Sequence, residues 1–109
     1  MIIKAISIKE PYASMILYEE KTIETRTWET SYRGDILLCA SKKPKTKISG
    51  NAFAIAELVD CRPMLLEDEW EAACPWYCGA YSWVLKNLRV IEPFSVKGRL
   101  RLFEVEYDR

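Results

Sequence analysis

Histidine is absent from this chain of 109 residues. Without an imidazole there can be no Ser-His-Asp or Cys-His relay, and no zinc or non-haem iron site that depends on histidine ligands. Any acid–base catalysis must then use lysine, glutamate, aspartate, tyrosine or cysteine side chains with shifted pKa values.

The chain also lacks an excess of either charge, because 16 Lys and Arg residues balance 16 Asp and Glu residues. This balance argues against a protein that holds long nucleic acid by bulk charge alone, although a local basic patch is compatible with it. There is no apolar run of about 18 residues, so we expect no membrane span. No long apolar stretch follows a basic head at the start, so we expect no signal peptide and a cytoplasmic protein with reduced thiols.

The four cysteines lack the close pairing that is typical of structural zinc sites. Cys39 and Cys61 are isolated, and Cys74 and Cys78 are separated by three residues rather than two. This spacing argues against a structural zinc site, and we expect no metal and no other cofactor. Cys39 lies in an apolar run, where a buried, small hydrophobic side chain is expected.

What the chain does contain is enough apolar surface for one core. Hydrophobic residues make up 50% and charged residues 29% of the sequence, as in an ordinary globular domain. At this length one domain is expected, covering residues 1–109. The polar, lysine-rich stretch 42–47 is too short to separate two domains and is expected to be an exposed loop.

Hydrophobic patterning predicts about six strands and two short helices. The expected strands cover residues 2–8, 22–28, 34–40, 51–59, 81–91 and 99–107, and the expected helices run from Pro11 to about Glu20 and over 67–73. Many short strands with one early helix indicate an α+β fold, a small and partly open mixed β-barrel with a helix after the first strand and a short second helix. We expect Trp83 in the core and Trp70 as the anchor of the second helix.

The most informative segment runs from Lys21 to Trp28. On a strand alternate residues share a face, so Thr22, Glu24, Arg26 and Trp28 lie together. One interpretation is a solvated face with a weak ion pair between Glu24 and Arg26. The other is a polar cleft in which these two charged groups must be paired, with Lys21 aimed at the same place by the preceding turn.

These residues belong to a set of motifs that closely resembles the ASCH domain, a family of the PUA-like superfamily of β-barrels. The resemblance is carried by SIKEPYA, KTIETRTW, YRG and ASKK, at residues 7–13, 21–28, 32–34 and 40–43. It extends to residues 81–85, 91–93 and 96–98 and so covers nearly the whole chain. The resemblance implies a PUA-like barrel with a cleft between the barrel and the first helix, lined by Lys21, Glu24 and Arg26.

The resemblance implies two kinds of function. ASCH domains were proposed as RNA-binding modules, whereas some bacterial relatives look like amidohydrolases that remove an acetyl group from N(4)-acetylcytidine. In those relatives a lysine, a threonine and a glutamate are taken as catalytic. The lysine matches Lys21, and the threonine falls where this chain has Glu24, with Thr22 and Thr25 adjacent. The catalytic candidates are therefore Lys21, Glu24 and Thr22, and a further carboxylate could come from Glu57, Glu67, Glu69 or Glu71.

The first hypothesis is a hydrolase for an acylated nucleobase. Water exclusion would lower the pKa of Lys21, and the neutral amine could deprotonate a water or a threonine. Arg26 could stabilise the oxyanion, and Trp28 or Tyr12 could stack on the base.

The second hypothesis is a non-catalytic module that binds RNA or a modified nucleoside. Lys42, Lys43, Lys45 and Lys47, with Arg33, would meet phosphates, unless these lysines are merely a solvated loop. Trp76, Tyr77, Tyr81 and Trp83 are the candidate stacking surfaces. Across both hypotheses the ligand-binding candidates are Pro11, Tyr12, Arg26, Trp28, Arg33, Ser41, Lys42 and Lys43.

Overall fold

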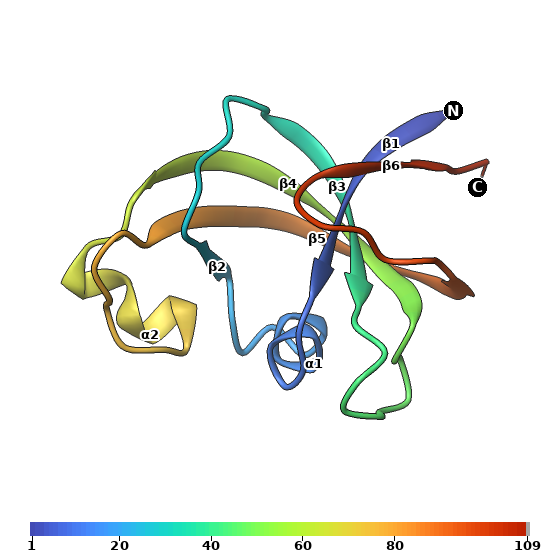
Figure 1. Cartoon of the computed structure of the whole chain (residues 1–109), viewed down its shortest axis with the longest axis horizontal. Helices are drawn as coiled ribbons and strands as arrows, with labels where there is room; N and C mark the ends of the chain where they lie inside the picture. The colour runs from blue at the N-terminus through green and yellow to red at the C-terminus, as the bar shows by residue number, and fades with distance from the viewer. Residues whose placement is uncertain (109) are drawn as a thin grey trace.

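The computed structural model describes residues 1–108 and shows a curved mixed sheet of six strands in the order β2-β5-β4-β3-β1-β6 (Figure 1). The strands are β1 (Ile2–Ile8), β2 (Ile23–Arg26), β3 (Gly34–Ala40), β4 (Asn51–Pro63), β5 (Tyr81–Ser95) and β6 (Phe103–Glu106). The helices are α1 (Tyr12–Leu17), the short 3-10 turn η1 (Leu66–Asp68) and α2 (Glu69–Ala72). The predicted α+β fold, a small and partly open mixed β-barrel with a helix after the first strand and a short second helix, is thus confirmed, in the form of an open six-stranded mixed sheet.

The strand β3 lies in the middle of the core, because an apolar cluster covers each of its two faces. Ile36, Leu38 and Ala40 pack into the main core with Phe53 and Trp83, whereas Leu37 and Cys39 face a second cluster. Five consecutive buried residues therefore replace the usual alternation. The predictions that Cys39 and Trp83 are buried are confirmed, since their exposed fractions are 2% and 1%.

Several elements differ in length from those predicted. α1 ends at Leu17 instead of about Glu20, because Glu19 adopts a left-handed backbone conformation with φ of 60°. β2 ends at Arg26, and Trp28 leaves the strand to pack edge-on against Trp83 at 4.8 Å. β4 and β5 are longer than predicted, because they pair with each other along almost their whole lengths.

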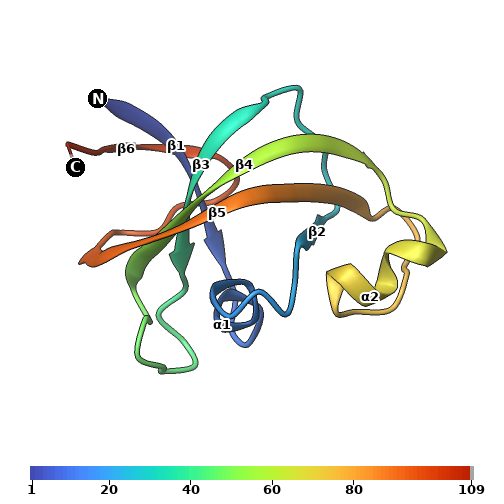
Figure 2. The same cartoon turned by 180° about the vertical axis from the view of Figure 1, so that it is seen from behind.

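The structure contradicts the prediction that Trp70 anchors the second helix, because this side chain is 89% exposed. The anchors are Ala72 and Asp68, which lie buried on the other face of the helical segment. The Asp68 carboxylate accepts hydrogen bonds from Arg62 at 2.6 and 3.0 Å and from the Ser82 hydroxyl at 2.9 Å. Figures 1 and 2 show α2 beyond the end of the β4–β5 pair, far from β1 and β6.

The loop at residues 42–47 connects β3 to β4 and is exposed, as predicted. Among residues 1–108, no helix combines the length and the apolar character that crossing a membrane requires.

Candidate functional site

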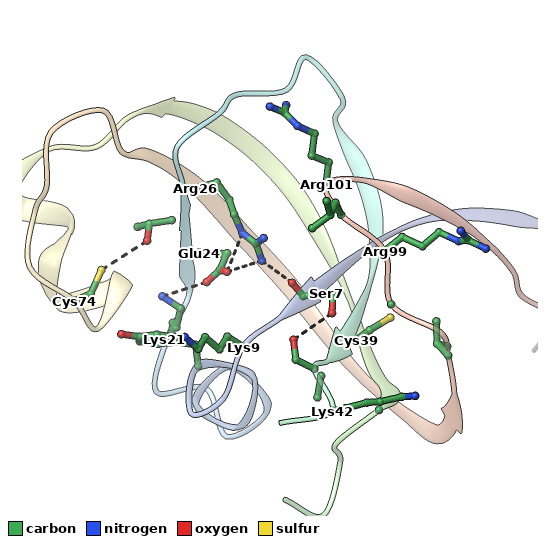
Figure 3. Close-up of a pocket in the computed structure, with 18 of the residues that line it drawn as sticks. Ser7, Lys9, Lys21, Glu24, Arg26, Cys39, Lys42, Cys74, Arg99 and Arg101 are labelled. Carbon is green, nitrogen blue, oxygen red and sulfur yellow. Dashed lines mark hydrogen bonds and ion pairs between the residues drawn. The ribbon is translucent and has the colours of Figure 1, made fainter. Parts of the chain in front are cut away.

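A cleft of about 1010 Å³ lies between the sheet, α1 and two loops (Figure 3). Its walls are parts of the segments 7–12, 21–26, 39–42, 74–77 and 96–101. The first three segments are the C-terminal end of β1, the β2 strand with its entry and the C-terminal end of β3. The last two are the loops that follow α2 and precede β6, so residues far apart in sequence share one cavity.

Lys21, Glu24 and Arg26 form an ion cluster in this cleft, in which Lys21 and Glu24 are buried and Arg26 is half-buried. Lys21 and Glu24 are only 2% and 8% exposed, and the distance from Lys21 Nζ to Glu24 Oε1 is 3.5 Å. The other Glu24 oxygen accepts hydrogen bonds from Arg26 Nε and a terminal guanidinium nitrogen at 3.1 and 2.9 Å. The interpretation of this segment as a solvated face is therefore wrong.

Contacts from distant elements fix the position of Lys21. Its ammonium group donates a hydrogen bond to the Ala72 carbonyl and lies 4.9 Å from the centre of the Tyr12 ring. The next backbone N–H, of Thr22, donates to the Glu71 carbonyl at 2.9 Å. Burial lowers the pKa of Lys21, while attraction to the Glu24 carboxylate opposes that shift.

The β2 strand presents Glu24 and Arg26 to the cleft because they are two residues apart on one strand. In the antiparallel ladder with β5, Glu24 is opposite Trp83 and Arg26 is opposite Tyr81. Ile23 points into a separate apolar cluster beneath α2. The Arg26 guanidinium also donates to the Ser7 carbonyl at 2.8 Å and thereby joins β2 to β1 across the cleft.

Positive charge is concentrated in the cleft although the whole chain is neutral. Within the described part of the chain, Glu24 is the only carboxylate among the lining residues. The lining cations are Lys9, Lys21, Arg26, Lys42, Lys97, Arg99 and Arg101. This arrangement attracts an anionic ligand and disfavours a metal cation. Among residues 1–108, no three metal-ligating side chains gather into a site for a metal ion.

Three of these cations belong to a segment that sequence reasoning missed. Residues 97–101, which we call the basic arm, carry Lys97, Arg99 and Arg101 along one wall of the cleft. Arg99 and Arg101 lie across the cleft from Lys21 and Glu24 (Figure 3). The strand predicted over residues 99–107 includes most of the arm, but β6 begins only at Phe103. In the sequence, the cations at every second position of this segment could have indicated a basic surface.

Three aromatic side chains line the cleft: Tyr12, Trp76 and Tyr77. Trp76 and Tyr77 are 44% and 37% exposed, and the Trp76 indole N–H donates to the Met64 carbonyl at 2.9 Å. Trp76 therefore offers an accessible ring in a fixed orientation. Trp83 is buried and Tyr81 packs against the core outside the lining, so neither is placed to stack on a ligand in the cleft.

The structure brings together only part of the predicted ligand-binding set. Tyr12, Arg26, Ser41 and Lys42 line the cleft, whereas Pro11, Trp28, Arg33 and Lys43 lie outside it. Trp28 packs on Trp83 and holds the Arg101 guanidinium 4.8 Å from its ring centre. Arg33 donates to the Thr30 and Tyr32 carbonyls and so braces its own loop.

The predicted catalytic set is divided in the same way. Lys21 and Glu24 line the cleft, but Thr22 is exposed outside it. Thr25 lines the cleft instead, with its hydroxyl 3.8 Å from the Cys74 sulfur. None of the four glutamates considered as a further carboxylate, at positions 57, 67, 69 and 71, is among the lining residues.

Two cysteines also line the cleft, Cys39 and Cys74. Burial raises the pKa of Cys39 to about 12, so its thiol stays protonated and is a poor nucleophile.

Comparison with known proteins gives a consistent family result. The family model of the ASCH domain matches residues 6–95. The crystal structure of ASCH from Zymomonas mobilis superposes with a TM-score of 0.72 at 16% identity, covering 94% of this chain and 87% of that chain. Two point mutants of that protein give TM-scores of 0.69 and 0.68 at 13% and 14% identity, covering 94% of this chain and 89% and 87% of theirs. A comparison with curated proteins gives no match.

Proposed function

The chain belongs to the ASCH domain family, and from this premise we propose that its cleft binds a short segment of single-stranded RNA. In this proposal a base occupies the part of the cleft near Lys21, Glu24 and Trp76, and the phosphates meet the basic arm and Lys42. Family membership is consistent with an RNA-binding module. A cytoplasmic location, with reduced thiols, belongs to the same proposal.

The observation that carries this proposal is the charge of the cleft wall. Seven cations face the cavity with one carboxylate, in a chain whose total charge is zero. Phosphate contacts supply most of the affinity for single strands, and an exposed ring such as Trp76 adds about 1–3 kcal/mol per stacked base. The exposed lysine loop contributes only Lys42 to the lining, so the basic arm replaces it as the main phosphate contact.

The test is a titration of a labelled single-stranded RNA followed by fluorescence anisotropy at several salt concentrations. Each phosphate contact contributes about −0.7 to the slope of log K against log salt. The triple substitution K97Q/R99Q/R101Q should therefore flatten the slope by about 2. The matched control K43Q/K45Q/K47Q removes the same charge outside the cleft and should leave the slope nearly unchanged. Equal effects of the two triples would contradict binding in the cleft.

A second candidate function is amide hydrolysis, favoured by the burial of Lys21 beside Glu24 and near the cleft-lining Thr25. A lysine whose pKa is lowered by burial can act as a base near neutral pH. In this mechanism neutral Lys21 takes a proton from water, and the hydroxide adds to the amide carbonyl. Arg26 stabilises the oxyanion. Lys21 then returns the proton to the leaving nitrogen as the C–N bond breaks.

This second function is tested with N(4)-acetylcytidine, by following the release of cytidine chromatographically. Lys21→Met preserves volume and removes the base, so it should abolish release, and Thr22→Ala outside the cleft should not. Release that persists in Lys21→Met would contradict the mechanism. If the wild type releases no cytidine, hydrolysis of this substrate is contradicted, whereas the RNA-binding proposal is unaffected.

A further inference from the structure

The helical segment beside the cleft presents an unusual apolar surface. We call residues 65–72 the acidic knob, because three glutamates and an aspartate lie within it. Trp70 is 89% exposed, and Leu66 and Leu65 are 69% and 46% exposed. A tryptophan this exposed leaves nearly its whole ring in water, where it gains nothing from the packing that aromatic side chains provide.

Apolar and acidic side chains are both exposed on the acidic knob. η1 and α2 form a continuous helical segment from Leu66 to Ala72. Leu66 and Trp70 are exposed on this segment, and so are the neighbouring Glu67 and Glu71. In the described part of the chain, no ion pair joins Glu67, Glu69 or Glu71 to a cation.

Hydrogen bonds to the sheet hold the backbone of the acidic knob in place. Buried Asp68 accepts hydrogen bonds from Arg62, Ser82 and the Leu65 backbone N–H, and the Glu71 carbonyl accepts one from Thr22 N–H. On this fixed backbone, an aromatic side chain with only two rotatable bonds provides a large contact area and loses little conformational entropy when a partner covers it.

We propose that the acidic knob is a docking surface for a cationic protein segment that carries apolar side chains. Apolar groups of the partner would cover Leu66 and Trp70, while its lysines or arginines would meet the Glu67 and Glu71 carboxylates. The same carboxylates would repel an RNA backbone, so the knob is distinct from the basic cleft. The partner would then be held next to the RNA site, since Glu69 accepts a hydrogen bond from the backbone N–H of the cleft residue Trp76.

The probe is a fluorescein-labelled amphipathic helical peptide of leucine and lysine, about 14 residues or four turns long. Its leucine–glutamate counterpart is the negative control, and binding is followed by anisotropy. The wild type should bind the lysine peptide, and Trp70→Ala should weaken binding about tenfold or more. E67Q/E71Q should also weaken binding and reduce its dependence on salt. Circular dichroism should show unchanged folding, because these side chains are exposed.

The matched controls are Tyr18→Ala, which removes another exposed aromatic, and E29Q/E92Q, which removes two exposed carboxylates elsewhere. Both should bind the peptide like the wild type. The proposal is overturned if they weaken binding as much as the knob variants, or if the knob variants bind normally. It is also overturned if Trp70→Ala instead abolishes RNA binding or a self-association seen by sedimentation, since the knob would then serve RNA or a second copy.

Discussion

At the scale of single residues, the buried Lys21–Glu24 pair is the feature of the cleft that depends most on its partners. Two charges withdrawn from water are tolerated because each finds an opposite charge and further hydrogen bonds. Lys21 has the Ala72 carbonyl, and Glu24 has Arg26. Removing either partner leaves a buried charge without compensation, which is far more destabilising than losing a surface ion pair.

Glu24→Gln should therefore lower the free energy of unfolding by about 3 kcal/mol, within the range found when buried pairs are broken. Urea denaturation measures this change. Glu104→Gln removes the carboxylate of the exposed Lys4–Glu104 pair and is the control, with an expected loss of about 1 kcal/mol or less. A loss in Glu24→Gln no larger than that of the control would show that the pair contributes little to stability.

Asp68 should make the protein sensitive to acid. The Arg62 guanidinium, with further hydrogen bonds from Leu65 N–H and Ser82, lowers the pKa of this carboxyl to about 2. Because the folded pKa lies below the unfolded value of about 3.9, ionised Asp68 stabilises the fold fully above that value. The contribution of about 2 kcal/mol is lost as pH falls from about 4 to about 2.

The measurement is the free energy of unfolding of the wild type and Asp68→Asn between neutral pH and about pH 2.5. The variant should be less stable at neutral pH but should lose less stability on acidification. Parallel curves for the two proteins would contradict a specific role for Asp68.

At the scale of elements, the position of the basic arm depends on Gly98. A Cβ atom at this position would lie 3.0 Å from the Ser7 hydroxyl oxygen, which is closer than such contacts normally are. Gly98→Ala should push the arm outward and weaken RNA binding about three- to tenfold, equivalent to one lost hydrogen bond of ordinary strength. Anisotropy titration measures the effect, and thermal unfolding should change little.

The control for this prediction is the double variant S7A/G98A. Ser7→Ala removes the oxygen that the new methyl group would meet, so the double variant should recover most of the affinity. If Gly98→Ala binds RNA normally, the arm does not need to lie against Ser7.

An element is predictable from the sequence when its own residues determine its bounds, and not when distant contacts do. β3 matches its predicted bounds, 34–40, because an apolar run between polar turns defines it in the sequence. The end of α1 depends on one left-handed residue, Glu19, and the start of β6 depends on Phe103 pairing with Ala5 far along the chain.

The same distinction applies to the candidate site. Alternation within one strand correctly predicts that Glu24 and Arg26 share a face, because no other element is needed for that inference. The contact of Lys21 with Ala72 spans 51 residues, and the basic arm faces Glu24 only through the folded sheet. The prediction that Trp70 anchors the second helix is wrong because helical spacing does not show which face of a short helix is buried.

At the scale of the whole molecule, opposite charges are segregated within a neutral chain. The cleft gathers cations, whereas the acidic knob beyond it gathers carboxylates. The net charge therefore does not predict how the protein associates with a polyanion, because the local electrostatic potential of the surface governs that association.

This segregation predicts retention on a heparin column at about pH 7.5, above the pI of about 6.3, where net charge alone predicts passage through it. K97Q/R99Q/R101Q should elute at lower salt than the wild type. The charge-matched K43Q/K45Q/K47Q should elute later than the arm variant. If the wild-type protein does not bind the column, the positive potential of the cleft does not control how the protein interacts with a polyanion.

The pairing of β1 has a consequence for how the protein is made. Ala5 of β1 is buried between two neighbouring strands, with Leu37 of β3 on one side and Phe103 of β6 on the other. Of these two neighbours, β6 lies at the other end of the sequence and is synthesised long after β1. While the ribosome is still translating the middle of the message, β1 has no β6 to cover its edge. Such long-range pairing folds slowly and leaves apolar strands exposed to chaperones. We therefore expect the nascent chain to become protease-resistant only after Phe103 has left the exit tunnel.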